Sequence, residues 1–173
     1  MRSRVNRRVG LSDPEIHPSA FVAANAVVRG SVTIARGAVI MFGAVIRAEE
    51  DVVIVGEETN IQDNAVVHCD AGFPARIGAR TTIGHAAVVH GATVDDGCLI
   101  GIGAIALNGS TMGEGAWLAA GAVLAEGATV PPWTLAAGVP AKPLREVTDG
   151  EIQRQINGVR TYLELGERYR RSG

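Results

Sequence analysis

The 173-residue sequence predicts an all-β fold, a parallel β-helix of about six triangular coils followed by a C-terminal α-helix. Three observations support this fold. Aliphatic residues recur every six positions, glycine is abundant with 22 residues, and aromatic residues make up only 4%. A period of six matches neither the 3.6-residue period of a helix nor the alternation of an ordinary strand. It is typical of a β-helix in which each hexapeptide forms one short strand and three strands form a coil.

The repeat runs from residue 16 to residue 130 with three changes of phase. It slips by three residues at residues 49–51, gains four residues around residues 70–74, and loses one residue after Val89. With coils ~4.8 Å apart, nineteen stacked positions correspond to a prism about 30 Å tall. An ordinary β-sandwich is the alternative, but its turns would not keep so strict a register. The side chains that we expect to stack inside the prism are Ile16, Val22, Val28, Ile34, Ile40, Ile46, Val55, Ile61, Val67, Ile77, Ile83, Val89, Val94, Ile100, Ala106, Met112, Leu118, Leu124 and Val130.

The chain divides into four predicted segments. Pro131 and Pro132 lack the N–H groups that a sheet requires, so we expect the repeat to end there. Thr148-Asp-Gly-Glu151 has the pattern of a capping box at a helix start. Apolar residues then follow at helical spacing, which predicts a helix with a structural role, packed on the prism. The segments are an N-terminal arm at 1–15, the repeat at 16–134, an extended connector at 135–147 and the helix at 148–171.

Composition excludes several classes of partner. The net charge is −2 and charged residues make up 20%, which does not favour a nucleic-acid or anionic-membrane partner. No apolar run approaches the ~20 residues of a membrane span. The cysteines, Cys69 and Cys98, form no C-x-x-C motif, so we expect a reduced, cytoplasmic setting. The basic residues of the first segment suggest a loose terminus or a subunit-contact arm.

Three of the four histidines lie within the repeat, at His68, His85 and His90. Neutral imidazole is a common zinc ligand, and three histidines define one type of catalytic zinc site. His68 and His90 each follow a repeat position by one residue, three repeats apart, so they should stack in one column. His85 follows Ile83 by two residues and belongs to a neighbouring face, above Asp63. It should lie on the order of 15 Å from the other two.

A second copy of the chain could supply the third histidine. If His85 of one chain faces the His68/His90 column of the next, the contact is heterologous, and a triangular prism suggests closure as a cyclic homotrimer. The same contact would bring Arg47, in the column of His68, opposite Asp63 as an ion pair. A lone histidine in such a repeat is usually a surface or packing residue. Three that symmetry brings together favour a metal.

These residues resemble the gamma-class carbonic anhydrase family, within the left-handed β-helix hexapeptide proteins. The resemblance covers most of the chain and is strongest in Ala44-Val-Ile-Arg47, Asn60-Ile-Gln-Asp63, His68-Cys-Asp-Ala-Gly-Phe-Pro74, Gly84-His85-Ala-Ala-Val-Val-His90-Gly91 and Gly138-Val-Pro-Ala-Lys142. It implies a left-handed coil and a homotrimer that hydrates carbon dioxide reversibly to bicarbonate.

The resemblance also implies roles for individual residues. His68, His85 and His90 match the metal ligands, with His85 from the adjacent subunit, and Arg47 and Asp63 match an interface pair. Gln62 matches a residue that hydrogen-bonds solvent at the metal, and Glu50 is the candidate proton shuttle. The metal would be Zn²⁺, although Fe²⁺ and Co²⁺ also accept imidazole.

Two alternatives remain open at the level of sequence. One departure from the family is Glu49, because the usual Arg-x-Asp reads Arg47-Ala-Glu49. The first alternative is a trimeric scaffold whose metal only holds the subunits together. The second is an acyl-CoA transferase or thioesterase of the hexapeptide type, which would use one histidine as a general base.

Overall fold

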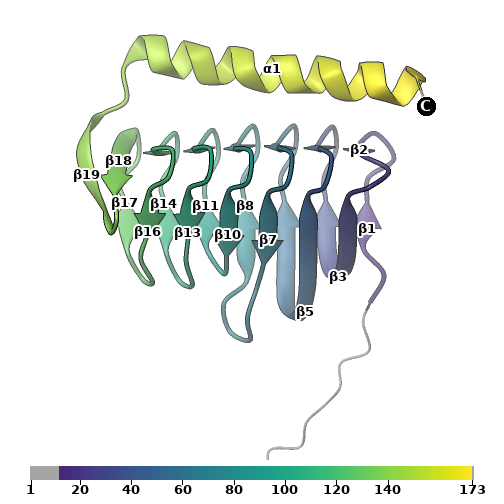
Figure 1. The fold of residues 1–173 in the computed structure, drawn as a ribbon, viewed down its shortest axis with the longest axis horizontal. Coiled ribbons are helices and arrows are strands. Elements are labelled where there is room, and N and C mark those ends of the chain that lie inside the picture. Colours follow the sequence, from purple (N-terminus) through teal and green to yellow (C-terminus); the bar gives the residue numbers. More distant parts are fainter. Residues whose placement is uncertain (1–11, 173) are drawn as a thin grey trace, which may run out of the picture.

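The hexapeptide repeat folds into a three-sided β-solenoid with a long helix lying along one side (Figure 1). The computed structural model describes residues 12–172, so the first eleven residues of the predicted N-terminal arm lie outside the described residues. Strands stack in parallel, each hydrogen-bonded to the equivalent strand of the next coil. The predicted fold class is confirmed.

The solenoid has three faces. Strands β3 and β5 turn a corner and therefore contribute to two faces. The first face consists of β3 (Val27–Ile34), β5 (Val45–Val55), β7 (Val66–His68), β10 (Val88–His90), β13 (Ile105–Ala106) and β16 (Val123–Leu124). The second face adds β1 (Glu15–Ile16), β8 (Ala75–Ile77), β11 (Thr93–Val94), β14 (Thr111–Met112) and β17 (Thr129–Val130). The third face consists of β2 (Phe21–Val22), β4 (Val39–Ile40), β6 (Asn60–Ile61), β9 (Thr82–Ile83), β12 (Leu99–Ile100), β15 (Trp117–Leu118) and β18 (Thr134–Gly138).

The repeat positions form the core. From Ile34 to Val130 every predicted position is at most 2% exposed. The prediction is wrong for Ile16, which is 40% exposed, and Val22 and Val28 are only partly buried. These three residues belong to the first coil, which has no coil beneath it among the described residues to cover its open end.

The solenoid has about seven turns rather than six, because it continues beyond the two prolines. Pro131 and Pro132 lie at a turn, where no ladder N–H is required. The chain then adds β18, which pairs in parallel with β15, and returns antiparallel as β19 (Ala141–Glu146). The segment predicted as an extended connector is therefore this hairpin, which closes the end of the prism.

Helix α1 (Asp149–Ser172) covers the third face and runs back along the solenoid (Figure 1). The predicted capping box is present, since the Thr148 N–H donates to Glu151 at 2.9 Å and the Glu151 N–H donates to the Thr148 hydroxyl at 3.3 Å. Near the far end, Tyr169 stacks on Phe21 with ring centroids 5.8 Å apart. Within residues 12–172, no helix has both the length and the apolarity to cross a membrane.

Candidate metal centre

The first face presents a column of basic side chains. Strand pairing places Arg29 beside Arg47, Arg47 beside His68, and His68 beside His90. The predicted stacking of His68 on His90 is confirmed, and their ring centroids are 5.0 Å apart. Each histidine follows a fully buried valine, which is why its side chain points out of the prism.

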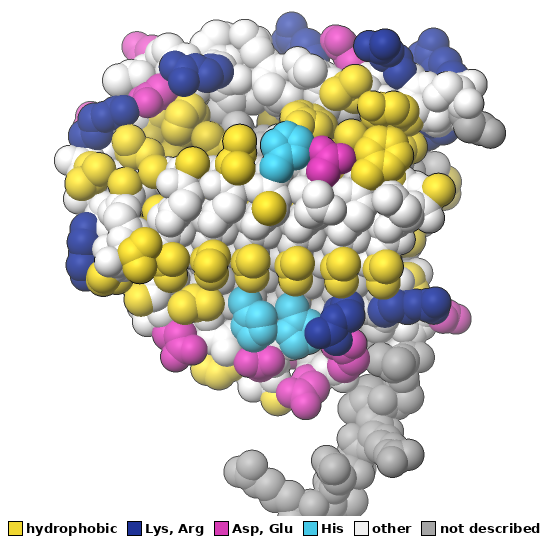
Figure 2. All heavy atoms as spheres, viewed as in Figure 1, with side chains coloured by type: hydrophobic (Ala, Val, Ile, Leu, Met, Phe, Trp, Pro, Cys, Tyr) yellow, Lys and Arg dark blue, Asp and Glu magenta, His cyan; other side chains and the backbone are white. Residues whose placement is uncertain are grey.

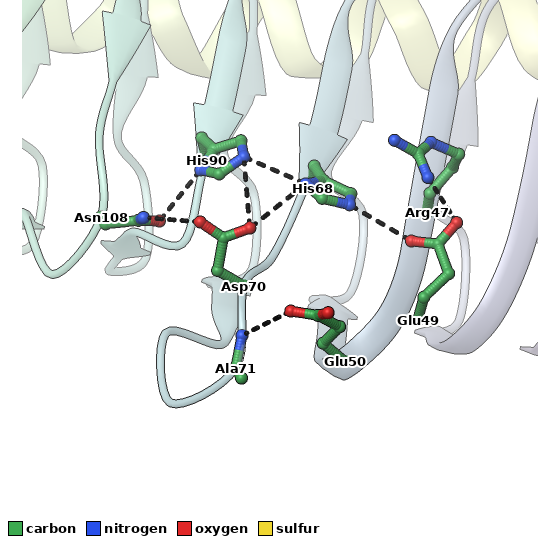
Figure 3. Close-up of polar contacts among 8 residues, drawn as sticks. All are labelled: Arg47, Glu49, Glu50, His68, Asp70, Ala71, His90 and Asn108. Atoms are coloured by element: carbon green, nitrogen blue, oxygen red, sulfur yellow. Dashed lines mark hydrogen bonds and ion pairs between the residues drawn. The ribbon is translucent and has the colours of Figure 1, made fainter. Parts of the chain in front are cut away.

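The hydrogen-bond partners of the two imidazoles differ, and they assign the ring nitrogens (Figure 3). Glu49 Oε2 lies 3.2 Å from His68 Nε2, and Asn108 Oδ1 lies 2.9 Å from His90 Nδ1. An acceptor on one ring nitrogen places the proton there and leaves the lone pair on the other. In neutral rings with these tautomers the lone pairs would be on His68 Nδ1 and His90 Nε2, and these two atoms lie 3.0 Å apart, within hydrogen-bonding distance.

Asp70 supplies a third donor atom at the same place. Its Oδ1 lies 4.0 Å from His68 Nδ1 and 3.9 Å from His90 Nε2. The circle through three atoms at these separations and 3.0 Å has a radius of about 2.1 Å, which is the length of a zinc–nitrogen or zinc–carboxylate bond. His68, Asp70 and His90 could therefore hold a metal ion. The donor set of two neutral imidazoles and one carboxylate suits a divalent transition metal.

The loop that carries Asp70 is the four-residue insertion in the repeat, and acidic side chains hold it in place. The Gly72 N–H donates to Asp51 at 3.0 Å, and the Ala71 N–H lies 3.4 Å from Glu50 Oε2 (Figure 3). The residues added by the phase slip at 49–51 and those added by the later insertion thus hydrogen-bond to each other. The first group supplies carboxylates, and the second group supplies the backbone donors and Asp70.

Asn108 connects the loop to the column from the next coil. Its amide nitrogen donates to Asp70 Oδ2 at 2.9 Å, while its oxygen accepts from His90. Gly91 allows this close approach, because a Cβ at that position would lie 2.1 Å from Asn108 Oδ1. The backbone of Gly91 also has φ of 59°, in the left-handed region.

His85 occupies a different corner, between the third face and the first, and lies outside the His68–Asp70–His90 cluster. Its Nδ1 lies 2.9 Å from Asp63 Oδ2, its column neighbour, and its Nε2 lies 3.2 Å from the Tyr162 hydroxyl of α1. Burial raises the pKa of Tyr162, and the nearby Asp63 carboxylate adds to this shift. Helix α1, predicted to be purely structural, therefore also contacts a predicted ligand.

Gln62 is buried, and both its amide nitrogen and its amide oxygen are hydrogen-bonded. Its amide nitrogen donates to Asn60 Oδ1 at 3.2 Å, and its oxygen accepts the His85 N–H at 3.1 Å. Asn60 in turn donates to the Thr82 hydroxyl, which also receives a hydrogen bond from Gln155 of α1. A buried network of amides thus joins the helix to Gln62. One N–H of Gln62 is left over for another acceptor.

Within the chain, the other predicted residues have local partners. Arg47 forms an ion pair with Glu49, which bridges it to His68 (Figure 3). Partial burial acts to raise the pKa of Glu49, but hydrogen bonds from Arg47 and His68 hold that pKa below its ordinary value. Asp63 pairs with His85, and Glu50 is exposed beside the loop. The proposed contact between Arg47 and Asp63 of another chain thus remains a prediction.

Sequence reasoning missed Asp70, Asn108 and Tyr162. The signal for Asp70 was its place two residues after His68 inside the insertion, a segment that the repeat count treated only as an interruption. Asn108 follows Ala106 by two residues, and its link to His90 depends on the turn between them. Tyr162 lies one residue before the apolar Leu163 and was indistinguishable from a packing residue.

A row of aliphatic side chains runs along the first face, next to the histidines. It contains one residue from each of the first six coils, and we call it the aliphatic row: Val27, Val45, Val66, Val88, Ile105 and Val123. Figure 2 shows the row crossing the surface, with two histidines along one side of it. On the corner of His85, the exposed Phe42 and Ile102 occupy the equivalent turn positions of coils on either side.

Comparisons with known proteins agree on one group of relatives. A probable carbonic anhydrase of Methanocaldococcus jannaschii is 49% identical over 146 residues, covering 84% of this chain and 92% of the relative. A carbonic anhydrase of Geobacillus kaustophilus is 41% identical over 157 residues, covering 91% and 86%. The mitochondrial gamma carbonic anhydrase 2 of Arabidopsis thaliana is 36% identical over 172 residues. The chain spans 62% of the length of that plant relative.

Two solved structures with the same fold are named as transferases and not as carbonic anhydrases. A hexapeptide transferase family protein from Anaplasma phagocytophilum has a TM-score of 0.87 and is 40% identical, with 90% of this chain and 92% of that chain covered. A candidate acetyltransferase from Bacillus cereus has a TM-score of 0.91 and is 34% identical, with 92% and 93% covered. No protein-family model matches the chain.

Proposed function

The chain belongs to the gamma carbonic anhydrase-like family of hexapeptide-repeat β-helix proteins, and we propose that it catalyses the reversible hydration of carbon dioxide to bicarbonate at a divalent metal. One observation carries the proposal: His68 Nδ1 and His90 Nε2 face each other at 3.0 Å, each with its other ring nitrogen engaged by an acceptor. Two lone pairs directed at one point, each supported by an acceptor on the far side of its ring, are the arrangement that a shared metal ion requires. We therefore assign a metal ion to the space between the two imidazoles.

We propose that His85 of a neighbouring chain completes the site. Asp63 Oδ2 would accept a hydrogen bond from the N–H at His85 Nδ1, which leaves Nε2 as the ligating atom. The Tyr162 hydroxyl, now 3.2 Å from Nε2, would then be free to bond solvent or substrate instead. A divalent cation held here would supply the chemistry by lowering the pKa of a water molecule, because neutral imidazoles do not offset its charge.

The remaining steps belong to side chains of this protein. Gln62 has a spare N–H next to His85, and we assign it the orientation of the nucleophile or of a carbon dioxide oxygen. Addition of water to carbon dioxide forms one C–O bond and releases one proton. Glu50, at the exposed edge of the loop, is the proposed relay that passes this proton to buffer.

A homotrimer with shared metal sites follows from this arrangement, and two features of the surface support it. The aliphatic row provides a continuous apolar strip beside the His68/His90 column, which a second copy would cover. The corner that carries His85 is apolar at Phe42 and Ile102, so it offers a complementary ridge. Arg47 and Asp63 would pair where the two surfaces meet.

The expected metal is Zn²⁺, with Fe²⁺ or Co²⁺ as alternatives, because all three accept imidazole. The buried thiols of Cys69 and Cys98 are free, and we propose a reducing, cytoplasmic setting. Burial raises the pKa of the Cys69 thiol. Burial also raises the pKa of Cys98, to about 12, which keeps this thiol protonated and unreactive.

The test is stopped-flow carbon dioxide hydration on protein reconstituted anaerobically with Zn²⁺, Co²⁺ or Fe²⁺. We expect a rate above background that is proportional to bound metal and is removed by chelation. Apo protein and the double variant His68→Ala/His90→Ala treated with the same metal are the controls, and both should give the background rate. If every fully loaded sample also gives only the background rate, the protein is a metal-stabilised scaffold and not an enzyme.

The names of the related solved structures favour acyl transfer as the second candidate. That activity would need one histidine as a general base and no metal. It predicts that acetyl-CoA raises the unfolding temperature and that transfer to an amine survives chelation. Hydration of carbon dioxide predicts the reverse on both counts, so one chelated sample separates the two functions.

A further inference from the structure

The cluster on the first face brings together three metal-ligand atoms from a single chain, those of His68, Asp70 and His90. A site shared between subunits would need only the two histidines from this chain. We propose that a single chain binds one divalent metal through His68, His90 and Asp70 without His85, and that Asn108 is the positioning residue that makes this possible. The inference deepens the proposed function, because it assigns His85 the completion of a site that already holds its metal.

The first step of the argument is the geometry of Asp70. Its Oδ1 faces both free imidazole nitrogens at about equal distance, 4.0 and 3.9 Å. Its other oxygen, Oδ2, is occupied by the Asn108 amide at 2.9 Å. The carboxylate is thereby turned so that one oxygen, and not two, points at the space between the histidines (Figure 3).

The second step is the double role of Asn108. Its side-chain oxygen accepts the Nδ1 proton of His90, and its nitrogen holds Asp70. The Asn108 amide therefore fixes the tautomer of His90 and the rotamer of Asp70. As a result, His90 Nε2 and Asp70 Oδ1 both face the space beside His68 Nδ1. Groups that orient ligands in this way change metal affinity by about 10- to 100-fold when they are removed.

The third step is charge and solvent access. One carboxylate at the cluster offsets half the charge of a divalent ion, and the side chains of His68, His90 and Asp70 are partly exposed in the single chain. Three protein ligands would fill half of an octahedral shell, so positions would stay open for water both before and after His85 of a neighbour binds. A metal could enter at this stage, and His85 of a neighbour would take an open position on assembly.

The experiment compares Co²⁺ binding by variants, measured by calorimetry and visible absorption. Its readout is the dissociation constant and not the enzymatic rate. We expect His85→Ala to bind one Co²⁺ per chain, with a dissociation constant that rises by no more than about 100-fold. Adding Asp70→Asn to His85→Ala should weaken binding at least a further 100-fold. Adding Asn108→Ala to His85→Ala should weaken it by about 10- to 100-fold.

Controls separate positioning from folding. Asn25→Ala removes a side-chain acceptor from the Gly43 N–H at a turn of an early coil, and it should leave Co²⁺ affinity unchanged. In apo protein, ¹⁵N NMR should show His90 protonated at Nδ1, and Asn108→Ala should shift it toward a mixture of tautomers. Loss of structure alone would be seen in circular dichroism, with no selective change at His90.

Three results would overturn the inference. These are loss of saturable Co²⁺ binding in His85→Ala, an unchanged affinity when Asp70→Asn is added, and an unaltered His90 tautomer in Asn108→Ala. Each of these would leave the proposed enzyme intact, because a site that depends on His85 can still hydrate carbon dioxide. Background hydration by loaded wild-type protein would instead reject the activity, and the binding constants would stand.

Discussion

At the scale of single residues, each imidazole of the proposed site has an acceptor behind it. Glu49 engages His68, Asn108 engages His90, and Asp63 engages His85. Such partners hold the ring orientation and raise the basicity of the ligating nitrogen. The longer side chain of Glu49, a departure from the family pattern, is what lets one carboxylate reach both Arg47 and His68.

Gln62 and Glu50 should differ in how their removal affects the rate. Gln62→Ala should lower kcat about tenfold at any buffer concentration, because one hydrogen bond in the transition state is worth roughly 1.4 kcal/mol. Glu50→Ala should lower kcat most at low buffer, since the buffer itself can take the proton. Stopped-flow hydration over a range of buffer concentrations measures both effects.

Metal content is the control for this pair of variants. Both should retain one metal per site, because neither residue is a proposed ligand. Recovery of the Gln62→Ala rate at high buffer would contradict the assigned role of Gln62. A buffer-independent loss in Glu50→Ala would show that Glu50 only holds the loop at Ala71.

The sequence was sufficient to locate His68, His85, His90, Asp63 and Gln62, because the six-residue count converts directly into columns. The sequence did not predict the position of Asp70, because Asp70 lies in the insertion, where the six-residue count does not apply. It was also insufficient for Tyr162. Helical periodicity predicts which face of α1 is buried, but the register of the helix along the solenoid depends on distant contacts such as Gly166 against Val39.

At the scale of elements, helix α1 links the end of the solenoid to the corner that carries His85. Gln155 donates to the Thr82 hydroxyl at 3.1 Å and to the Cys98 carbonyl at 3.0 Å, and Tyr162 reaches His85. A polar residue in the buried stripe of a helix is costly unless it is satisfied. Gln155 therefore fixes the register in which Tyr162 meets His85.

The start of α1 should make stability depend on pH. Hydrogen bonds from Arg145, and then from the Thr148 N–H, hold the pKa of Glu151 far below its ordinary value of 4.5. A carboxyl group whose pKa is lowered by folding stabilises the folded state above its unfolded pKa, and this contribution fades as pH falls toward the folded pKa. Glu151→Gln should therefore be less stable than wild type at neutral pH, with the difference shrinking below about pH 4.5.

Urea unfolding followed by tryptophan fluorescence measures this difference, because Trp117 and Trp133 lie in the groove beside α1. Gln153→Ala, at an exposed and uncharged position of the same helix, is the matched control and should keep the pH dependence of the wild type. A wild-type advantage that persists undiminished at about pH 3 would contradict the assigned role of Glu151.

At the scale of the whole molecule, the solenoid carries two different edges, which the proposed trimer would bring together. One edge carries the His68/His90 column and the aliphatic row, and the other carries His85 and Asp63. The repeat made this architecture predictable in outline, including the face on which each histidine lies. The repeat did not predict the seventh turn. Pro131 and Pro132 suggested that the solenoid ends, but prolines are tolerated at a corner, where no ladder N–H is required.

A charge in the aliphatic row should prevent assembly without unfolding the chain. Ile105→Lys places an ammonium group where a second copy would bury it, at a position one coil from His90. We expect the trimer dissociation constant to rise at least tenfold, since an unpaired buried charge costs several kcal/mol. Sedimentation velocity over a range of concentrations measures the shift.

Thr129→Lys is the control for this substitution, because Thr129 is an exposed β-branched residue at the matching position of the second face. It should leave assembly unchanged. Equal behaviour of the two variants would mean that the aliphatic row is not the contact surface.

The central claim is that each active site is built from two chains, and mixed rings test it most directly. His68→Ala and His85→Ala homotrimers should each be inactive, because every site lacks a ligand. Co-refolding the two variants with Zn²⁺ should restore carbon dioxide hydration, since each mixed ring joins an intact His68/His90 column to an intact His85 at one interface. Mixed rings that assemble and bind metal but remain at the background rate, while wild-type rings are active, would contradict the account.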